Sequence, residues 1–149
     1  LNGDGTELAD YVLMEADGSR GLPLKAPAEH EPVLPERVSL VVAVAGMSCT
    51  GQTVREAAHR PERYALLAGL CETDLVTPDA VARVLCHPQG QRKGVAVRFA
   101  VALNQADTPQ RLMFARDVAR RLPCDALILA LQSTDGVLER WRDGRPVQA

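Results

Sequence analysis

The stretch Tyr11-Val-Leu-Met-Glu15-Ala-Asp17-Gly-Ser-Arg-Gly21 decides the predicted fold, because an apolar run changes there into acidic and glycine-rich sequence. The run at 11–14 is unbroken and too short for a helix, which is typical of a strand buried on both faces of a parallel sheet. We therefore predict a buried strand at 11–14, followed at its carboxyl end by a functional loop that extends to Pro35.

Two carboxylates follow this predicted strand. Successive strand side chains point to opposite faces, so Glu15 and Asp17 would share a face with Cα atoms roughly 6.6 Å apart. This pair resembles the Walker B carboxylates of P-loop nucleotide hydrolases, which hold Mg²⁺ directly or through water. The sequence thus predicts a Mg²⁺ site at Glu15 and Asp17. The alternative is a pair of solvated acidic residues at a strand end.

The rest of the chain alternates apolar strands with amphipathic helices. Further strands are predicted at 37–44, 95–103 and 126–131, with helices at 53–58, from 61 onward, at 77–86 and at 108–122. Two of the helices begin at Thr77-Pro78 and Thr108-Pro109, where Thr is a suitable cap and Pro suits the first turn. This alternation predicts an α/β fold with a parallel sheet covered by helices on both faces.

Length and composition are consistent with one α/β domain over residues 1–149. Residues 135–149 do not continue the alternation of strands and helices. We predict that they form an edge hairpin or a frayed tail, with a turn at Asp143-Gly144. Within that tail we interpret Trp141 as a packing residue over a sheet edge and not as a ligand contact.

Charge and cysteine content restrict the function classes. The net charge of −2 and the pI near 5.9 give no general attraction to nucleic acid or to anionic membranes. No apolar run approaches the length of a membrane span. The four cysteines are widely spaced and lack a Cys-x-x-Cys pair, so we predict reduced thiols in a cytoplasmic protein.

A longer string is more specific. Residues 15–32, Glu-Ala-Asp-Gly-Ser-Arg-Gly-Leu-Pro-Leu-Lys-Ala-Pro-Ala-Glu-His-Glu-Pro, are called here the signature segment. They resemble the YqeC family, which is regarded as a group of accessory proteins for selenium-dependent molybdenum hydroxylases, in selenium cofactor biosynthesis. The resemblance extends to about Thr134. It implies a three-layer fold like that of the P-loop nucleoside triphosphatases, with a phosphate loop near the N-terminus.

This chain has no Gly-x-x-x-x-Gly-Lys-Ser/Thr motif. The nearest glycine-rich segment, Asn2-Gly-Asp-Gly-Thr6, lacks the lysine and precedes the wrong strand. We therefore expect the chain to be the C-terminal part of a longer protein, and its P-loop-like fold to be incomplete because the N-terminal phosphate-loop unit is missing.

The loop after the first strand is expected at the carboxyl edge of the sheet, where open α/β sheets bind ligands. There the resemblance implies that Gly18 and Gly21 permit close backbone approach to a terminal phosphate, while Arg20 and Lys25 hold phosphate or an anionic partner. The loop also carries Ser19, Glu29 and His30, the last of which we interpret as hydrogen-bonded or exposed. The alternative is a proline-stiffened surface loop with solvated charges.

A second polar segment, Asn104-Gln-Ala-Asp107, directly follows the predicted strand at 95–103. It resembles the Asn-Lys-x-Asp guanine motif of GTP-binding proteins, with Gln105 in the lysine position. Asn104 and Asp107 are therefore predicted to contact a nucleotide base, with guanine selectivity in doubt because the lysine stem is lost. Asn and Asp are also ordinary turn residues, so a simple turn is the alternative.

Three functions remain open. The first is a nucleotide-dependent factor for hydroxylase maturation, with Mg²⁺ and ATP or GTP bound in the full-length protein. Its partner would be a selenium-dependent molybdenum hydroxylase or the cofactor machinery, with homo-oligomers a further option. Nucleoside triphosphatase activity is expected only in the longer protein, and no catalytic residue is assigned. The second is a protein-interaction module with a vestigial nucleotide fold, and the third a thiol carrier using Cys49.

Overall fold

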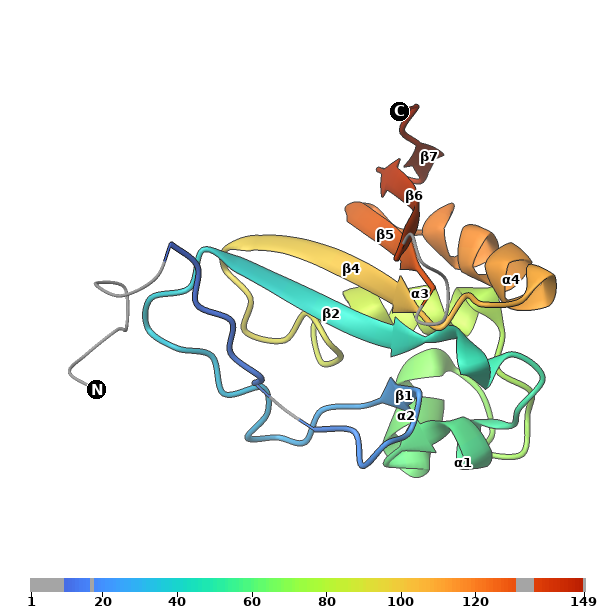
Figure 1. Cartoon of the computed structure of the whole chain (residues 1–149). Helices are drawn as coiled ribbons and strands as arrows, with labels where there is room; N and C mark the ends of the chain where they lie inside the picture. Colours follow the sequence, from blue (N-terminus) through green and yellow to red (C-terminus); the bar gives the residue numbers. More distant parts are fainter. Residues whose placement is uncertain (1–9, 17, 131–135, 149) are drawn as a thin grey trace.

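A computed structural model describes residues 10–16, 18–130 and 136–148. Within these residues the main sheet has five strands in the order β2-β4-β5-β6-β7 (Figure 1). Strands β2, β4 and β5 are parallel, and the last two strands run antiparallel to their neighbours. The strands are β2 (Leu40–Gly46), β4 (Arg98–Asn104), β5 (Asp125–Leu129), β6 (Val137–Arg142) and β7 (Arg145–Pro146).

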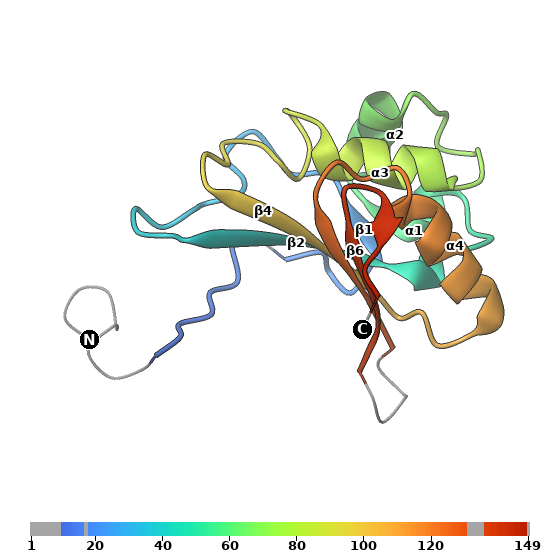
Figure 2. The same ribbon diagram turned by 90° about the horizontal axis from the view of Figure 1, so that it is seen from above.

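The helices lie on one side of this sheet (Figure 2). They are α1 (Val54–Ala57), α2 (Pro61–Ala68), α3 (Pro78–Cys86) and α4 (Pro109–Ala119), with a short 3₁₀ helix η1 (Met47–Cys49). Crossovers between parallel strands are right-handed, and the strand order advances in one direction from β2 through β4 to β5. Successive crossovers therefore place their helices on the same face.

The predicted α/β class is confirmed, with a mixed main sheet in which β2, β4 and β5 are parallel, but a second helical layer is not seen among the described residues. The P-loop-like fold stays a prediction. None of the described helices has the length and apolar character needed to cross a membrane.

The two faces of the sheet differ in burial. On the helix-covered face, Ala43 and Ala45 of β2 are buried, together with Val101 and Leu103 of β4 and Ile128 of β5. On the opposite face, Val42 and Val44 are exposed, and pairing places Val44, Ala102 and Leu127 in one row across three strands. We call the exposed residues Leu40, Val42, Val44 and Leu127 the uncovered face.

The strand predicted at 11–14 is wrong. These residues have no regular secondary structure, and Tyr11 is 89% and Leu13 96% exposed. The physical reason is the absence of a neighbour, because no described strand pairs with this segment. A strand gains its backbone hydrogen bonds only from a partner, and apolar side chains alone do not supply them.

A small second sheet was not predicted. Strand β1 (Leu24–Lys25), within the signature segment, pairs in parallel with β3 (Ala58–His59), which lies between α1 and α2. The Ala26 amide continues this pairing by donating to the His59 carbonyl at 3.2 Å. The second half of the signature segment is thereby attached to the helical layer.

The end of the chain forms a hairpin at the far edge of the main sheet, with Asp143 and Gly144 at positive φ in its turn. Trp141 is buried, and its indole N–H donates to Glu139 at 3.0 Å. The Arg120 guanidinium lies 5.9 Å from the Trp141 ring centroid. These contacts are those of the packing residue that the sequence predicts.

Candidate functional site

The loops after β2 and β4 meet the signature segment at the carboxyl edge of the main sheet. The Gly46 amide donates to the Pro23 carbonyl at 2.8 Å, and Ser48 Oγ donates to Gln105 Oε1 at 2.7 Å. A Cβ at Gly46 would lie 2.4 Å from Gln105 Oε1 and 2.9 Å from Pro23 Cβ. Only glycine permits this convergence, which places the predicted loop where ligands bind in open α/β sheets.

The first half of the signature segment makes few contacts at this edge. Residues 19–22 form a turn in which the Leu22 amide donates to the Ser19 carbonyl at 3.1 Å, with Arg20 and Gly21 at positive φ. A Cβ at Gly18 or Gly21 would meet no described atom within 4 Å. The chain itself therefore does not require close packing at these glycines, and their predicted role toward phosphate stays a prediction.

Only one member of the predicted metal pair lies in the described part of the chain. Glu15 is exposed and lies in irregular chain, so the shared strand face on which the prediction rested is missing. Asp17 lies outside the described residues. Within the part of the chain that the structure describes, no cluster of three His, Cys, Asp or Glu side chains is suited to a metal ion. Magnesium binding by Glu15 and Asp17 stays a prediction.

Lys25, which the sequence predicts to hold phosphate or an anionic partner, forms an ion pair within the chain, and its ligand role stays a prediction. Its side chain is only 4% exposed, and its ammonium lies 3.0 Å from Glu31 Oε2. Arg60 donates to both oxygens of the same carboxylate, at 2.9 and 3.1 Å, and also to the Ala26 carbonyl. Two cations thus share Glu31, which fastens the second half of the signature segment to the start of α2.

The electrostatics of this cluster follow from its geometry. Partial burial raises the pKa of Glu31, but hydrogen bonds from the Ala28 amide, Arg60 and Lys25 outweigh it and lower that pKa to about 2. The pKa of His59 is lowered by desolvation and by nearby Arg60, Arg20 and Lys25. At neutral pH His59 is therefore uncharged beside a carboxylate that is fully ionised.

Sequence reasoning missed His59 and Arg60. Arg60 adopts a left-handed conformation directly before Pro61, the first residue of α2, and it reaches a carboxylate 29 positions earlier. No local pattern reveals such a long-range pair. The predicted loop residues Glu29 and His30 are exposed, and the Glu29 carbonyl accepts a hydrogen bond from Lys93.

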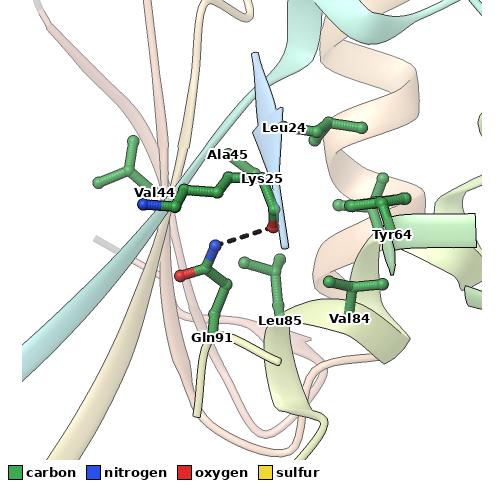
Figure 3. Close-up of a pocket in the computed structure, with 9 residues that line it drawn as sticks. Leu24, Lys25, Val44, Ala45, Tyr64, Val84, Leu85 and Gln91 are labelled. Carbon is green, nitrogen blue, oxygen red and sulfur yellow. Dashed lines mark hydrogen bonds between the residues drawn. The ribbon is translucent and has the colours of Figure 1, made fainter. Parts of the chain in front are cut away.

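Figure 3 shows the interior beside β1. The cavity there has a volume of only about 10 Å³, and its walls include Leu24, Val84, Leu85 and Tyr64. The side-chain amide of Gln91 donates to the Lys25 carbonyl at 2.9 Å and closes one side. A space of this size holds at most one water molecule, so it is not a ligand site.

A larger pocket lies at the second predicted group. Its volume is about 400 Å³, which suits a nucleobase or another small planar ligand. Asp107 supplies a carboxylate at its wall, and the pocket lies between the start of α4 and β6. The lining residues are Ala106, Asp107, Thr108, Pro109, Leu112, Ala130 and Leu138.

The structure separates the roles of the residues before this pocket. Asn104 Oδ1 accepts a hydrogen bond from the Gln105 amide at 2.8 Å and so shapes the turn, in which Gln105 has a positive φ of 64°. The Gln105 side chain is hydrogen-bonded to Ser48 and does not line the pocket. Of the predicted base contacts, Asp107 is therefore at the pocket, whereas Asn104 supports the turn.

Cys49 is unsuited to the role of a thiol carrier. Its side chain is fully buried, and burial raises its pKa to about 12. A thiol of this kind is protonated at neutral pH and inaccessible to a partner.

These features define the class of protein: an α/β protein with a mixed sheet, whose candidate ligand site lies where the parallel strands end. Residues 4–62 match the family model described as YqeC protein. This range contains both the signature segment and the His59-Arg60 pair. The match confirms the resemblance over residues 4–62.

One curated relative is an uncharacterized protein YqeC from Escherichia coli (strain K12). It is 48% identical over 88 residues, which cover 58% of this chain and 34% of the relative. The chain thus matches about a third of the length of that relative. No solved structure matches the chain significantly.

Proposed function

We propose that this chain is the nucleotide-binding part of a YqeC-like accessory factor for the maturation of selenium-dependent molybdenum hydroxylases. The observation that carries the nucleotide role is the pocket of about 400 Å³ beside Asp107, at the end of a parallel strand. The maturation role is supported by family resemblance.

The chemistry of the pocket favours a purine with adjacent N–H donors. The Asp107 carboxylate would accept from guanine N1–H and from the exocyclic amine. Leu112 and Leu138 would cover the base from α4 and β6, and so replace the aliphatic stem that Gln105 lacks. Adenine presents an acceptor at the equivalent ring position, which a carboxylate disfavours. We therefore propose GTP over ATP for the full-length protein.

The phosphates would extend toward the turn at Arg20 and Gly21, with Mg²⁺ held by Glu15 and Asp17 in the full-length protein. The sequence of this chain contains no P-loop lysine, and P-loop backbone amides and lysine supply much of the positioning needed for phosphoryl transfer. Residues 1–149 should accordingly bind nucleotide weakly and release no phosphate from ATP or GTP.

The test is titration of residues 1–149 with GDP and with ADP by isothermal calorimetry or by NMR. We expect GDP to bind more tightly, and Asp107→Ala to weaken GDP roughly 10- to 100-fold, because a charge-assisted hydrogen-bond acceptor is lost. The control is Asp79→Ala, since Asp79 is an exposed helix residue paired with Arg83. Equal binding of both nucleotides, unchanged by Asp107→Ala, would refute the base site.

The second candidate, a protein-interaction module, is favoured by the uncovered face. Parallel sheets are ordinarily covered on both sides, but Val42, Val44 and Leu127 are exposed here. Replacement of Val42 and Val44 by Thr should abolish partner binding and leave GDP affinity unchanged. Nucleotide binding with no dependence of partner binding on these valines would favour the first candidate.

A further inference from the structure

The uncovered face of the main sheet has an apolar centre built from three neighbouring strands, and the described helices lie on the other side of the sheet (Figure 2). Strand pairing places Val44 of β2, Ala102 of β4 and Leu127 of β5 in one row, and the row before it pairs Val42 with Ala100. The middle strand thus carries small side chains between larger ones that are exposed. A helix, the ordinary cover of parallel strands, fits this relief because its axis can lie above the small residues while its side chains contact the larger ones.

Four arginines border this apolar centre. In the strand pairing, Arg98 and Arg140 each lie opposite an exposed leucine of the uncovered face, so their side chains belong to that face. Arg142 follows Arg140 by two positions on β6, and Arg145 of β7 pairs with Arg142, which places both on the same face. All four arginines are exposed.

The border carries more positive than negative charge. Asp125 of β5 pairs with Ala100 and therefore lies on the uncovered face. Its carboxylate accepts a hydrogen bond from Arg142 Nε at 3.2 Å, and it lies 3.8 Å from Arg98 Nη2. One carboxylate is thus shared by two arginines. Among the described strand residues, this face has an excess of positive charge around its apolar centre.

The helix-covered face of the same sheet is different. Its strand residues Val101, Leu103 and Ile128 are almost fully buried. Its charged strand residue, Glu139, forms an ion pair with Arg116 of α4. A face that is covered within the chain thus has buried apolar residues and a paired charge. An apolar centre with an exposed, arginine-rich border is instead typical of a surface at which two proteins associate.

We propose that the uncovered face binds an amphipathic helix of a partner protein, which carries carboxylates along its flank. The apolar side of this helix would lie over Val42, Val44 and Leu127. Its carboxylates would lie beside Arg98 and Arg140. The proposal rests on the second candidate function, the protein-interaction module, and names the chemistry of the partner.

Charge complementarity determines the choice of partner. Carboxylates on the flank of the helix match the excess positive charge of the border, whereas a basic helix would be repelled by it. The uncovered face of a second copy of this chain would bring arginines against arginines, and is disfavoured for the same reason.

The test measures binding of two designed helical peptides, each of about 18 residues or five turns, to residues 1–149 by fluorescence anisotropy. Both peptides carry the same leucine stripe, and they differ only at the flanking positions, which are glutamate in one and lysine in the other. We expect the glutamate peptide to bind roughly 10-fold more tightly at low salt. The ratio should decrease at high salt, because the arginines are exposed and their charges are screened.

Substitutions separate the apolar contribution from the charged one. Val42→Thr combined with Val44→Thr replaces two methyl groups with hydroxyls and should weaken both peptides at least about 10-fold. Arg140→Glu should weaken the glutamate peptide and strengthen the lysine peptide, a reversal that unfolding does not produce. The matched control is Arg83→Glu, at an exposed arginine of α3 in the helical layer, which should change neither affinity.

Circular dichroism verifies that each variant is folded. Three results would overturn the proposal: equal affinity for the two peptides, no response to Arg140→Glu, or self-association of residues 1–149 through the uncovered face in sedimentation velocity. Equal affinity that still depends on Val42 and Val44 would refute the acidic partner and leave the interaction module intact. Binding that is independent of these valines as well would refute the interaction module itself.

Discussion

Residues 22–32 and residues 11–21 are adjacent in sequence, but the structure holds them very differently. The first range pairs with β3, contacts Gly46 through Pro23 and has Glu31 in ion pairs. The described residues of the second range have exposed apolar side chains and form a local turn at 19–22. Residues 22–32 are thus the better-anchored range, because the charged side chains of Lys25 and Glu31 form ion pairs. The apolar run at 11–14 has no described strand with which to pair.

The largest effect should come from Glu31, the carboxylate that holds two cations. Glu31→Gln would remove the negative charge that lies beside both Lys25 and Arg60, and the Lys25 side chain is almost fully buried. We expect a loss of roughly 3–4 kcal/mol in the free energy of unfolding, measured by urea denaturation. The control Glu29→Gln, on an exposed neighbour, should change it by less than about 0.5 kcal/mol. Equal effects of the two substitutions would contradict an anchoring role for Glu31.

The same carboxylate predicts a pH dependence. Folding lowers the pKa of Glu31 from 4.5 to about 2, so its stabilisation is complete above the unfolded value and disappears as pH falls through the folded value. The difference in unfolding free energy between wild type and Glu31→Gln should therefore shrink by roughly 2–3 kcal/mol from about pH 5 to about pH 2. Denaturation curves across this range measure it. A constant difference would show that folding does not shift the pKa of Glu31.

Local sequence signals were sufficient for much of the fold. Thr77 and Thr108 cap their helices by accepting from the backbone amides three residues later, as the Thr-Pro pattern predicts. The three parallel strands β2, β4 and β5 were predicted from apolar runs of strand length at 37–44, 95–103 and 126–131. These signals depend on residues within one turn or one strand, so the sequence contains them directly.

Features that depend on tertiary pairing were not predictable. The Arg60–Glu31 pair joins positions 29 residues apart, and Leu138 reaches the pocket only because β6 runs antiparallel to β5. Asp107 was placed correctly at the sheet edge because it directly follows a strand. The prediction of a buried strand at 11–14 was wrong because apolar character indicates burial but does not show whether a partner strand is present.

Two glycine substitutions, one at the residue that contacts Pro23 and one within residues 11–21, should change the free energy of unfolding by less than Glu31→Gln does. Gly46→Ala would bring a Cβ within 2.9 Å of Pro23 Cβ and 3.1 Å of its Cα, where backbone must move. We expect a loss of about 1–2 kcal/mol from the clash. Gly18→Ala, which meets no described atom within 4 Å, should stay within about 0.5 kcal/mol. Similar losses at both glycines would show that residues 15–21 pack against the sheet in solution.

The smallest effect is expected at the apolar run itself. Tyr11 and Leu13 are 89% and 96% exposed, so Tyr11→Ser and Leu13→Ser remove no packing, and each should change the unfolding free energy by less than about 0.5 kcal/mol. The reference is Val101→Ser in the inner strand β4, where a buried methyl pair is lost and a hydroxyl is buried, at a cost of roughly 2–4 kcal/mol. Thermal and urea denaturation of the three variants give the comparison. If Leu13→Ser costs as much as Val101→Ser, the run is a buried strand in solution, and the uncovered edge of β2 is the place where it pairs.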